Sequence, residues 1–194
     1  MKQSADKHLI LWISSLTGNT ESIACVLIRT LLEEGLQPLL AGPDRKMLAR
    51  LCGKYGLKEA DSVDPEADLP VILCFWCRRG TMDDRSASFL ASLKRRRLLV
   101  FGTMGSYPAS LYGRMVYENV KNLADRENLL RGLFLCRGRI DPARTERRRR
   151  LSKDHLHYLD DEAYARHLSS RSHPDENDKR NAAAFLLAHL SDLL

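Results

Sequence analysis

Five short apolar runs alternate along the chain with segments whose apolar residues recur every three or four positions. The runs at 8–14, 71–76 and 98–102 are almost continuously apolar, which is typical of strands buried on both faces of a parallel sheet. Two further runs lie at 37–41 and 131–137. The pattern therefore predicts five strands with helices between them.

The segments between the runs carry helical patterns. Ile23, Leu27 and Leu31 lie four positions apart, on one face of a helix expected at 20–34, and Gly35 ends that pattern. The last segment begins with Pro174 and acidic residues, which favour a helix start. Further helices are expected at 44–55, 83–95, 109–124 and 174–193.

This alternation indicates an α/β protein with a doubly wound, five-stranded parallel sheet and helices on both faces. The expected strand order is 2-1-3-4-5, which places a ligand site at the carboxyl ends of strands one, three and four. We expect a single domain over 1–194. The charged segment 138–173, with its arginine run at 147–150, fits none of these patterns and is interpreted as an irregular extension before the last helix.

Composition and charge limit the classes of protein to which this chain can belong. No apolar stretch approaches the roughly 20 residues that a membrane-spanning helix needs. The apolar run that begins the chain is also too short for a signal peptide, so we expect a cytoplasmic protein. The five cysteines, an odd number, indicate reduced thiols. The net charge of +6 lies within 1–140, since 141–194 carry equal numbers of acidic and basic residues, and no nucleic-acid-binding module is evident.

The loop after the first expected strand carries the most specific chemistry: Ser15-Leu16-Thr17-Gly18-Asn19-Thr20. Its hydroxyls can donate to phosphate oxygens, Gly18 permits a tight turn, and the free amides of a helix start favour an anion. The Walker lysine and the dinucleotide pattern Gly-x-Gly-x-x-Gly are absent, which argues for a monophosphate ester. The alternative interpretation is an ordinary helix cap.

This loop resembles the phosphate loop of flavodoxins, Ser/Thr-x-Thr-Gly-x-Thr, which it matches in full and at the same place in the chain. The resemblance implies a flavodoxin-like fold and FMN as cofactor. Flavodoxins hold the isoalloxazine between the loops after strands three and four, which implies ring contacts from Trp76, Cys77, Gly80, Thr103, Met104, Gly105 and Tyr107.

Trp76 and Tyr107 are the candidates to stack on the ring, because planar side chains favour such contacts. The alternatives are that Trp76 is a core aromatic and that Tyr107 is an exposed loop residue, with Tyr112 as a rival. Asp83 is interpreted as a helix cap. No third ligand accompanies the histidines at 155 and 157, so no metal site is expected.

Several further motifs are similar to a subgroup of bacterial flavodoxin-like proteins, one of which is linked to bilirubin reduction; for this chain that physiology is an analogy at the level of the fold. The motifs are Trp76-x-x-x-Gly80-Thr81-x-Asp83, Phe101-Gly102-Thr103-Met104-Gly105, Phe134-Leu135-Cys136-x-Gly138-x-Ile140 and Ser172-His173-Pro174-Asp175.

Three functional hypotheses follow. The first is an FMN-binding electron-transfer protein, without catalytic residues of its own, acting as a monomer or homodimer. Flavodoxins tend to be acidic, but the loops here carry Arg78, Arg79, Arg85 and Arg114, so the docking face of a redox partner protein is expected to be acidic. The alternatives are an NAD(P)H-dependent FMN or quinone reductase on the same fold, and a binding module that has lost flavin.

Overall fold

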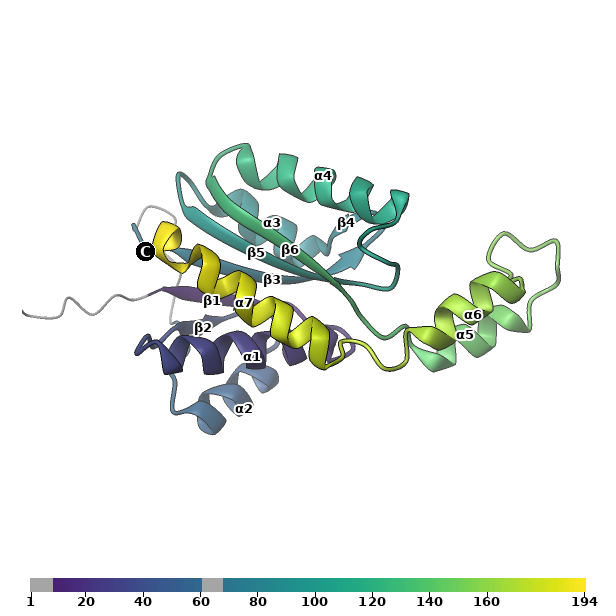
Figure 1. The fold of residues 1–194 in the computed structure, drawn as a ribbon, viewed down its shortest axis with the longest axis horizontal. Helices are drawn as coiled ribbons and strands as arrows, with labels where there is room; N and C mark the ends of the chain where they lie inside the picture. The colour runs from purple at the N-terminus through teal and green to yellow at the C-terminus, as the bar shows by residue number, and fades with distance from the viewer. Residues whose placement is uncertain (1–8, 61–67) are drawn as a thin grey trace, which may run out of the picture.

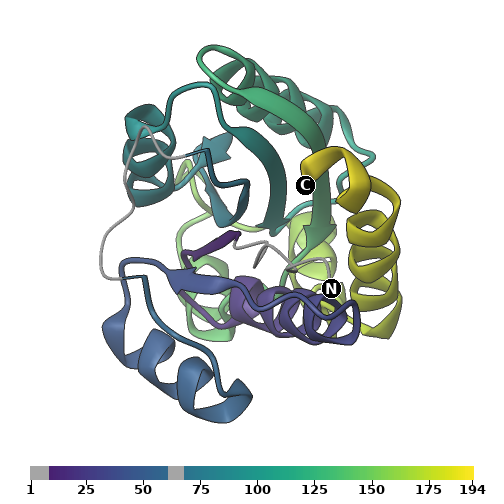
Figure 2. The same ribbon diagram turned by 90° about the vertical axis from the view of Figure 1, so that its left-hand side faces the viewer.

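The parallel sheet has the predicted strand order. The computed structural model describes residues 9–60 and 68–194, so the expected strand start at residue 8 and the residues at 1–7 lie outside the described residues. The order β2-β1-β3-β5-β6 is the predicted 2-1-3-4-5, with helices on both faces (Figures 1 and 2). The strands are β1 (Ile10–Ile13), β2 (Leu39–Ala41), β3 (Val71–Arg78), β5 (Arg97–Met104) and β6 (Leu129–Arg137).

One short strand was not predicted. β4 (Thr81–Met82) pairs antiparallel with the end of β3, with Cys77 opposite Met82. The turn between them contains Arg79 and Gly80, both with positive φ. This hairpin turns the chain back after β3, so the start of α3 lies beside the carboxyl end of β1.

Two cores explain why the strands are apolar throughout. Alternate residues of β3 point to opposite faces, so Ile72 and Cys74 belong to one core while Leu73 and Phe75 belong to the other. The first core is covered by α1 (Asn19–Glu33), α2 (Arg45–Tyr55) and α7 (Glu176–Leu193), and the second by α3 (Asp84–Ser92) and α4 (Leu111–Asp125).

The segment 138–173 is not irregular, which corrects the sequence interpretation. It contains α5 (Pro142–Arg149) and α6 (Asp161–Ser169), which extend beyond the carboxyl edge of the sheet (Figure 1). Residues 142–169 are called the α5–α6 lobe. Thr145 is the buried residue of α5, and α6 has none. Without a buried apolar stripe, neither helix produces the periodicity that reveals a helix in sequence.

Buried Arg137, the last residue of β6, anchors the lobe to the sheet. Its Nη2 donates to the carbonyl of Arg166 at 2.6 Å and to Oγ of Ser169 at 2.9 Å, while Nη1 donates to the carbonyl of Ser169 at 3.3 Å. The guanidinium also lies 4.0 Å from the ring centroid of Tyr107. One cation therefore joins the sheet, the loop after β5 and the end of α6.

Asp83 caps α3, as predicted, and also ties α3 to β1. Its Oδ1 accepts from the amide of Ser86 at 3.2 Å and from the hydroxyl of Ser14 at 2.9 Å. Its Oδ2 accepts from the Ser86 hydroxyl at 2.8 Å. All three side chains are buried, so each polar group depends on the others for its hydrogen bonds.

In the described part of the chain, no helix is both long and apolar enough to cross a membrane. All five cysteines lie in that part, and each is free.

Replacing Asp83 by alanine should lower the free energy of unfolding by about 2–3 kcal/mol, because the helix cap is lost and buried hydroxyls are left without partners. Chemical denaturation monitored by circular dichroism measures the change. The matched control is Asp84→Ala, which removes an exposed ion pair with Arg78 and should cost below about 0.5 kcal/mol. Equal effects of the two substitutions would contradict this assignment.

Candidate functional site

The loops after β1, β3, β5 and β6 meet at the carboxyl edge of the sheet around a pocket of about 290 Å³, called the edge pocket. It brings together eight of the thirteen residues predicted from sequence: Leu16, Thr17, Asn19, Trp76, Cys77, Thr103, Met104 and Gly105. Residues between the end of β6 and the first turn of α5 complete the lining: Gly138, Arg139, Ile140, Asp141 and Arg144.

The phosphate loop leads directly into α1. Gly18 is the N-cap residue, with a left-handed φ of 82°, and as a glycine it has no side chain to cap the helix. Glycine adopts this conformation without strain. Ser15 Oγ accepts from the amide of Glu21 at 3.2 Å, while the helix start keeps the partial positive charge that favours an anion.

Asn19 joins the phosphate loop to the chain after β6. Its Nδ2 donates to Thr17 Oγ1 at 3.1 Å and to the carbonyl of Arg139 at 2.9 Å. A Cβ built on Gly138 would lie only 2.9 Å from that nitrogen, so a larger residue at this position would displace Asn19. This contact places Arg139 at the rim of the edge pocket.

The Thr20 hydroxyl differs from the expectation that it faces a phosphate. Thr20 is 1% exposed, and its Oγ1 lies 2.9 Å from Thr103 Oγ1 and donates to the carbonyl of Phe75 at 3.3 Å. Thr17, in contrast, is exposed and lines the edge pocket. Of these two threonines, only Thr17 presents its hydroxyl to a ligand.

Trp76 lies between two hollows. With Leu16 it lines both the edge pocket and a neighbouring groove of about 730 Å³, to which Ser15 also contributes. Trp76 is half-buried and belongs to neither hydrophobic core, so its role as a core aromatic is not supported. The groove is lined by four basic residues, called its basic rim, and by three acidic ones: Arg45, Lys46, Arg78 and Arg85, and Asp44, Asp83 and Asp84.

Cys77 also lines the edge pocket, from the opposite side of β3. Burial raises the pKa of its thiol, and a hydrogen bond with Tyr112 lowers it in part. The thiol is therefore protonated at neutral pH and a poor nucleophile. Cys77 contributes shape and a weak hydrogen-bonding group to this pocket.

The loop after β5 contributes backbone to the edge pocket. A Cβ on Gly105 would lie 2.8 Å from Cγ1 of Ile140, so only glycine lets the two loops approach this closely. Buried Thr103 and Met104 precede it at the end of β5.

Five predicted residues do not line the edge pocket: Ser15, Gly18 and Thr20 belong to the loop at 15–20, and the other two are Tyr107 and Gly80. Tyr107 stacks under Arg137, and its hydroxyl lies 3.3 Å from Ser169 Oγ, so it faces the lobe. The Ser169 hydrogen bond and the charge of Arg137 lower the pKa of Tyr107. Gly80 is buried in the β3–β4 turn, where its carbonyl accepts from Asn119 Nδ2 at 3.0 Å.

The sequence pattern did not reveal the basic residues that line the edge pocket. Gly138 and Ile140 belonged to the family motif, but Arg139 and Arg144 fell in the segment without a helical pattern. Of the arginines singled out from sequence, Arg78 is paired with Asp84. Among the residues that line the pocket, the positive charge therefore comes from the chain after β6 and from α5, where Arg139 and Arg144 accompany the acidic Asp141.

One group of metal-ligating side chains lies away from this pocket, at the start of α7. Ligand atoms of His173, Asp175 and Asp178 lie within 4.8 Å of one another. Asp175 accepts from the amides of Asn177 and Asp178, and Asp178 accepts from the amide of Asp175. These carboxylates form a capping box, which accounts for their arrangement.

Comparisons with known proteins agree with this architecture. Residues 9–187 match the family model for the flavodoxin domain. The flavodoxin-like domain-containing protein BilS of Clostridioides difficile (strain CD3) is 31% identical over 182 residues, which cover 92% of this chain and 93% of that protein. A short-chain flavodoxin associated with a non-canonical PDU bacterial microcompartment is 13% identical, with a TM-score of 0.50 over 96% of this chain and 97% of its own. Oxidised flavodoxin 2 from Bacillus cereus is 18% identical, with a TM-score of 0.49 over 96% and 99% of the two chains.

Thr20→Val should destabilise the protein by about 1–2 kcal/mol, because Thr103 then keeps a buried hydroxyl without its partner. Thr17→Val changes an exposed hydroxyl in the same loop and should cost less than about 0.5 kcal/mol. Urea unfolding of both variants measures the difference. If Thr17→Val were the more destabilising substitution, the division of roles between the two threonines would be wrong.

Proposed function

The chain belongs to the flavodoxin domain family, which confirms the resemblance predicted from the loop at 15–20, and we propose that it is an FMN-binding electron-transfer protein. The observation that carries the proposal is the edge pocket, where a hydroxyl-bearing helix start, an aromatic side chain and positive charge meet at the carboxyl ends of the strands. Doubly wound sheets bind their ligands at this edge.

The phosphate of FMN would lie at the start of α1. The exposed Thr17 hydroxyl and the amides after Gly18 supply donors, and Arg139 and Arg144 supply charge beside them. Charge-assisted hydrogen bonds to a phosphate are stronger than neutral ones. Since no Walker lysine is present, this donor set suits a monophosphate ester.

The ring would lie against Trp76, the half-buried aromatic that separates the edge pocket from the groove. The flavin supplies the redox chemistry when bound, and the protein supplies binding, orientation and electrostatics. Met104 and Gly105 bring backbone to the same pocket. Tyr107 is held by Arg137, so we assign the stacking role to Trp76.

The redox partner would dock at the basic rim of the groove. Arg45 and Arg78 are paired there with Glu59 and Asp84, while Lys46 and Arg85 add further positive charge. A basic rim attracts an acidic surface and speeds encounter with it. We propose an acidic docking face on the partner protein, and a cytoplasmic location for both.

Titration of the purified protein with FMN should quench the fluorescence of the flavin and yield a one-to-one complex. Thr17→Ala should weaken binding by about tenfold, the effect of losing one charge-assisted hydrogen bond. Ser22→Ala, one turn further along α1 and outside the edge pocket, should change the affinity less than about twofold. A protein that stays colourless after FMN soaking would support the non-flavin alternative.

An electron carrier should exchange electrons with a protein and not with a nicotinamide. We expect dithionite to bleach the FMN-loaded protein anaerobically within the mixing time, and an equal amount of NADPH to leave its absorbance unchanged over minutes. Stopped-flow absorbance at the flavin maximum measures both. Rapid bleaching by NADPH alone would replace this proposal with the reductase alternative.

A further inference from the structure

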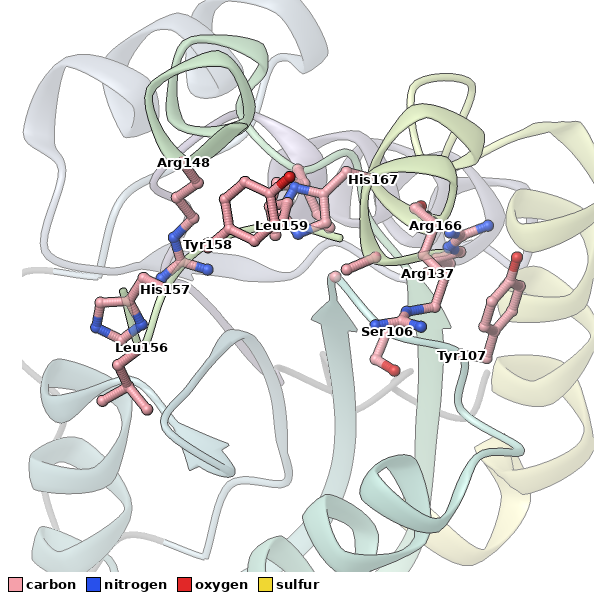
Figure 3. A pocket seen from close by; sticks show the side chains of 13 residues that line it. Ser106, Tyr107, Arg137, Arg148, Leu156, His157, Tyr158, Leu159, Arg166 and His167 are labelled. Atoms are coloured by element: carbon pink, nitrogen blue, oxygen red, sulfur yellow. Dashed lines mark hydrogen bonds between the residues drawn. The ribbon is translucent and has the colours of Figure 1, made fainter. Parts of the chain in front are cut away.

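A second pocket, of about 340 Å³, lies between the carboxyl edge of the sheet and the α5–α6 lobe (Figure 3). We call it the lobe pocket. Three arginines and two histidines line it: Arg137, Arg148, Arg166, His157 and His167. Among the described residues that line it, none is acidic. Arg166 is paired with Glu162, which lies outside the lining, so the hollow is basic chiefly through Arg137 and Arg148. None of these residues belongs to the proposed phosphate loop.

Arg137 at the base of this pocket has no carboxylate partner within 9–60 and 68–194. Arg137 is 4% exposed, and among the described residues its buried Nε has no hydrogen-bond acceptor. Its Nη groups bond to backbone carbonyls and a serine hydroxyl, all uncharged. Burial of a cation without a counter-ion is costly, so the site favours an incoming anion.

The lobe adds positive charge on the opposite side of the same pocket. Figure 3 shows Arg148 reaching from α5 toward His157, across the pocket from Arg137. Burial lowers the pKa of Arg148, and the charge of Arg144 one turn earlier lowers it further. Burial also lowers the pKa of His167, together with repulsion from Arg148, Arg144 and Arg166. The lowered pKa leaves His167 uncharged at neutral pH, so the positive charge on this side of the pocket comes from the arginines.

The rest of the lining includes several apolar side chains and continues toward the edge pocket. Leu159 and Ala163 form part of the wall, and Gly105 and Ile140 line both this pocket and the edge pocket. A ligand seated here would thus lie next to the proposed FMN site. Because Arg137 is so deeply buried, a small molecule can reach it more readily than a side chain on the surface of a folded partner.

We propose that the lobe pocket binds a small organic anion, with its carboxylate or phosphate group toward Arg137 and Arg148 and its apolar part against Ile140 and Leu159. Its position beside the flavin rests on the proposed function. Binding of the anion does not, since none of these charged groups belongs to the phosphate loop.

The test uses two probes with the same ring and different anionic groups, phthalate and phenyl phosphate, with benzyl alcohol as the neutral control. Isothermal titration calorimetry of the full chain gives affinities, and the Nε–Hε NMR signal of Arg137 reports the site. We expect at least one anionic probe to bind and shift that signal, and benzyl alcohol to leave it unchanged. The tighter probe identifies the carboxylate or the phosphate as the natural group.

Arg148→Gln should weaken the bound probe about tenfold, and Arg148→Lys should restore part of the affinity because it keeps the charge. The matched control is Arg147→Gln, which removes the same charge from an exposed position on α5 and should change the affinity less than about twofold. Equal losses in the Arg148 and Arg147 glutamine variants would mean that general charge, and not this pocket, binds the probe.

Failure of both anionic probes to shift Arg137 would overturn the inference. So would a shift produced only by an acidic peptide, because that result would assign the pocket to a protein partner. FMN titration of the same samples separates the two proposals. A protein that binds FMN and neither probe refutes the lobe pocket alone, whereas one that binds a probe and no FMN refutes the flavin proposal alone.

Discussion

The buried hydroxyl of Thr20 determines where the parts of the site meet. It contacts Thr103 at the end of β5 and the carbonyl of Phe75 within β3, so the first turn of α1 is held against both strands. The next residues in those strands are Met104 and Trp76. One side chain thus fixes the positions of the phosphate loop, Trp76 and the loop after β5 relative to one another. Because all three groups are buried, moving any of them would leave a polar atom unsatisfied.

The sheet was predictable because a parallel strand covered on both faces must be apolar at successive positions, as β3 is at Val71–Phe75. The position of the loop at 15–20, between β1 and the first turn of α1, was predictable because its glycine and the following helical pattern are local features. The opposite roles of Thr17 and Thr20 were not, since both are threonines in one turn and only the packing of α1 decides which is buried. The α5–α6 lobe escaped prediction because its helices are stabilised by caps at Asp141 and Asp160 and carry no apolar stripe.

The arginines at the carboxyl edge of the sheet are compensated differently on the side of the sheet loops and on the side of the α5–α6 lobe. On the sheet side, Arg78 is paired with Asp84, and its charge is largely offset. On the lobe side, the guanidinium of Arg137 donates to two carbonyls and a hydroxyl and lies over the ring of Tyr107, and no described residue pairs a carboxylate with it. A cation–π contact and carbonyl dipoles compensate part of the cost of burying that charge. The lobe is therefore attached through a buried arginine without a carboxylate partner among the described residues, while the sheet is stabilised by its hydrophobic cores.

The hydrogen bond from Asn19 to the carbonyl of Arg139 spans 120 positions of sequence and joins the loop that would hold the cofactor to the base of the lobe. A hydrogen bond shared by two elements couples the ordering of one to the ordering of the other. A ligand that orders the loop also stabilises the attached lobe, and ordering of the lobe stabilises the loop by the same free energy. Binding of a ligand in the edge pocket would then change how firmly α5 and α6 are held, and a second molecule could detect that change at their outer surface. A partner touching only those helices could distinguish the loaded protein from the empty one without contacting the flavin.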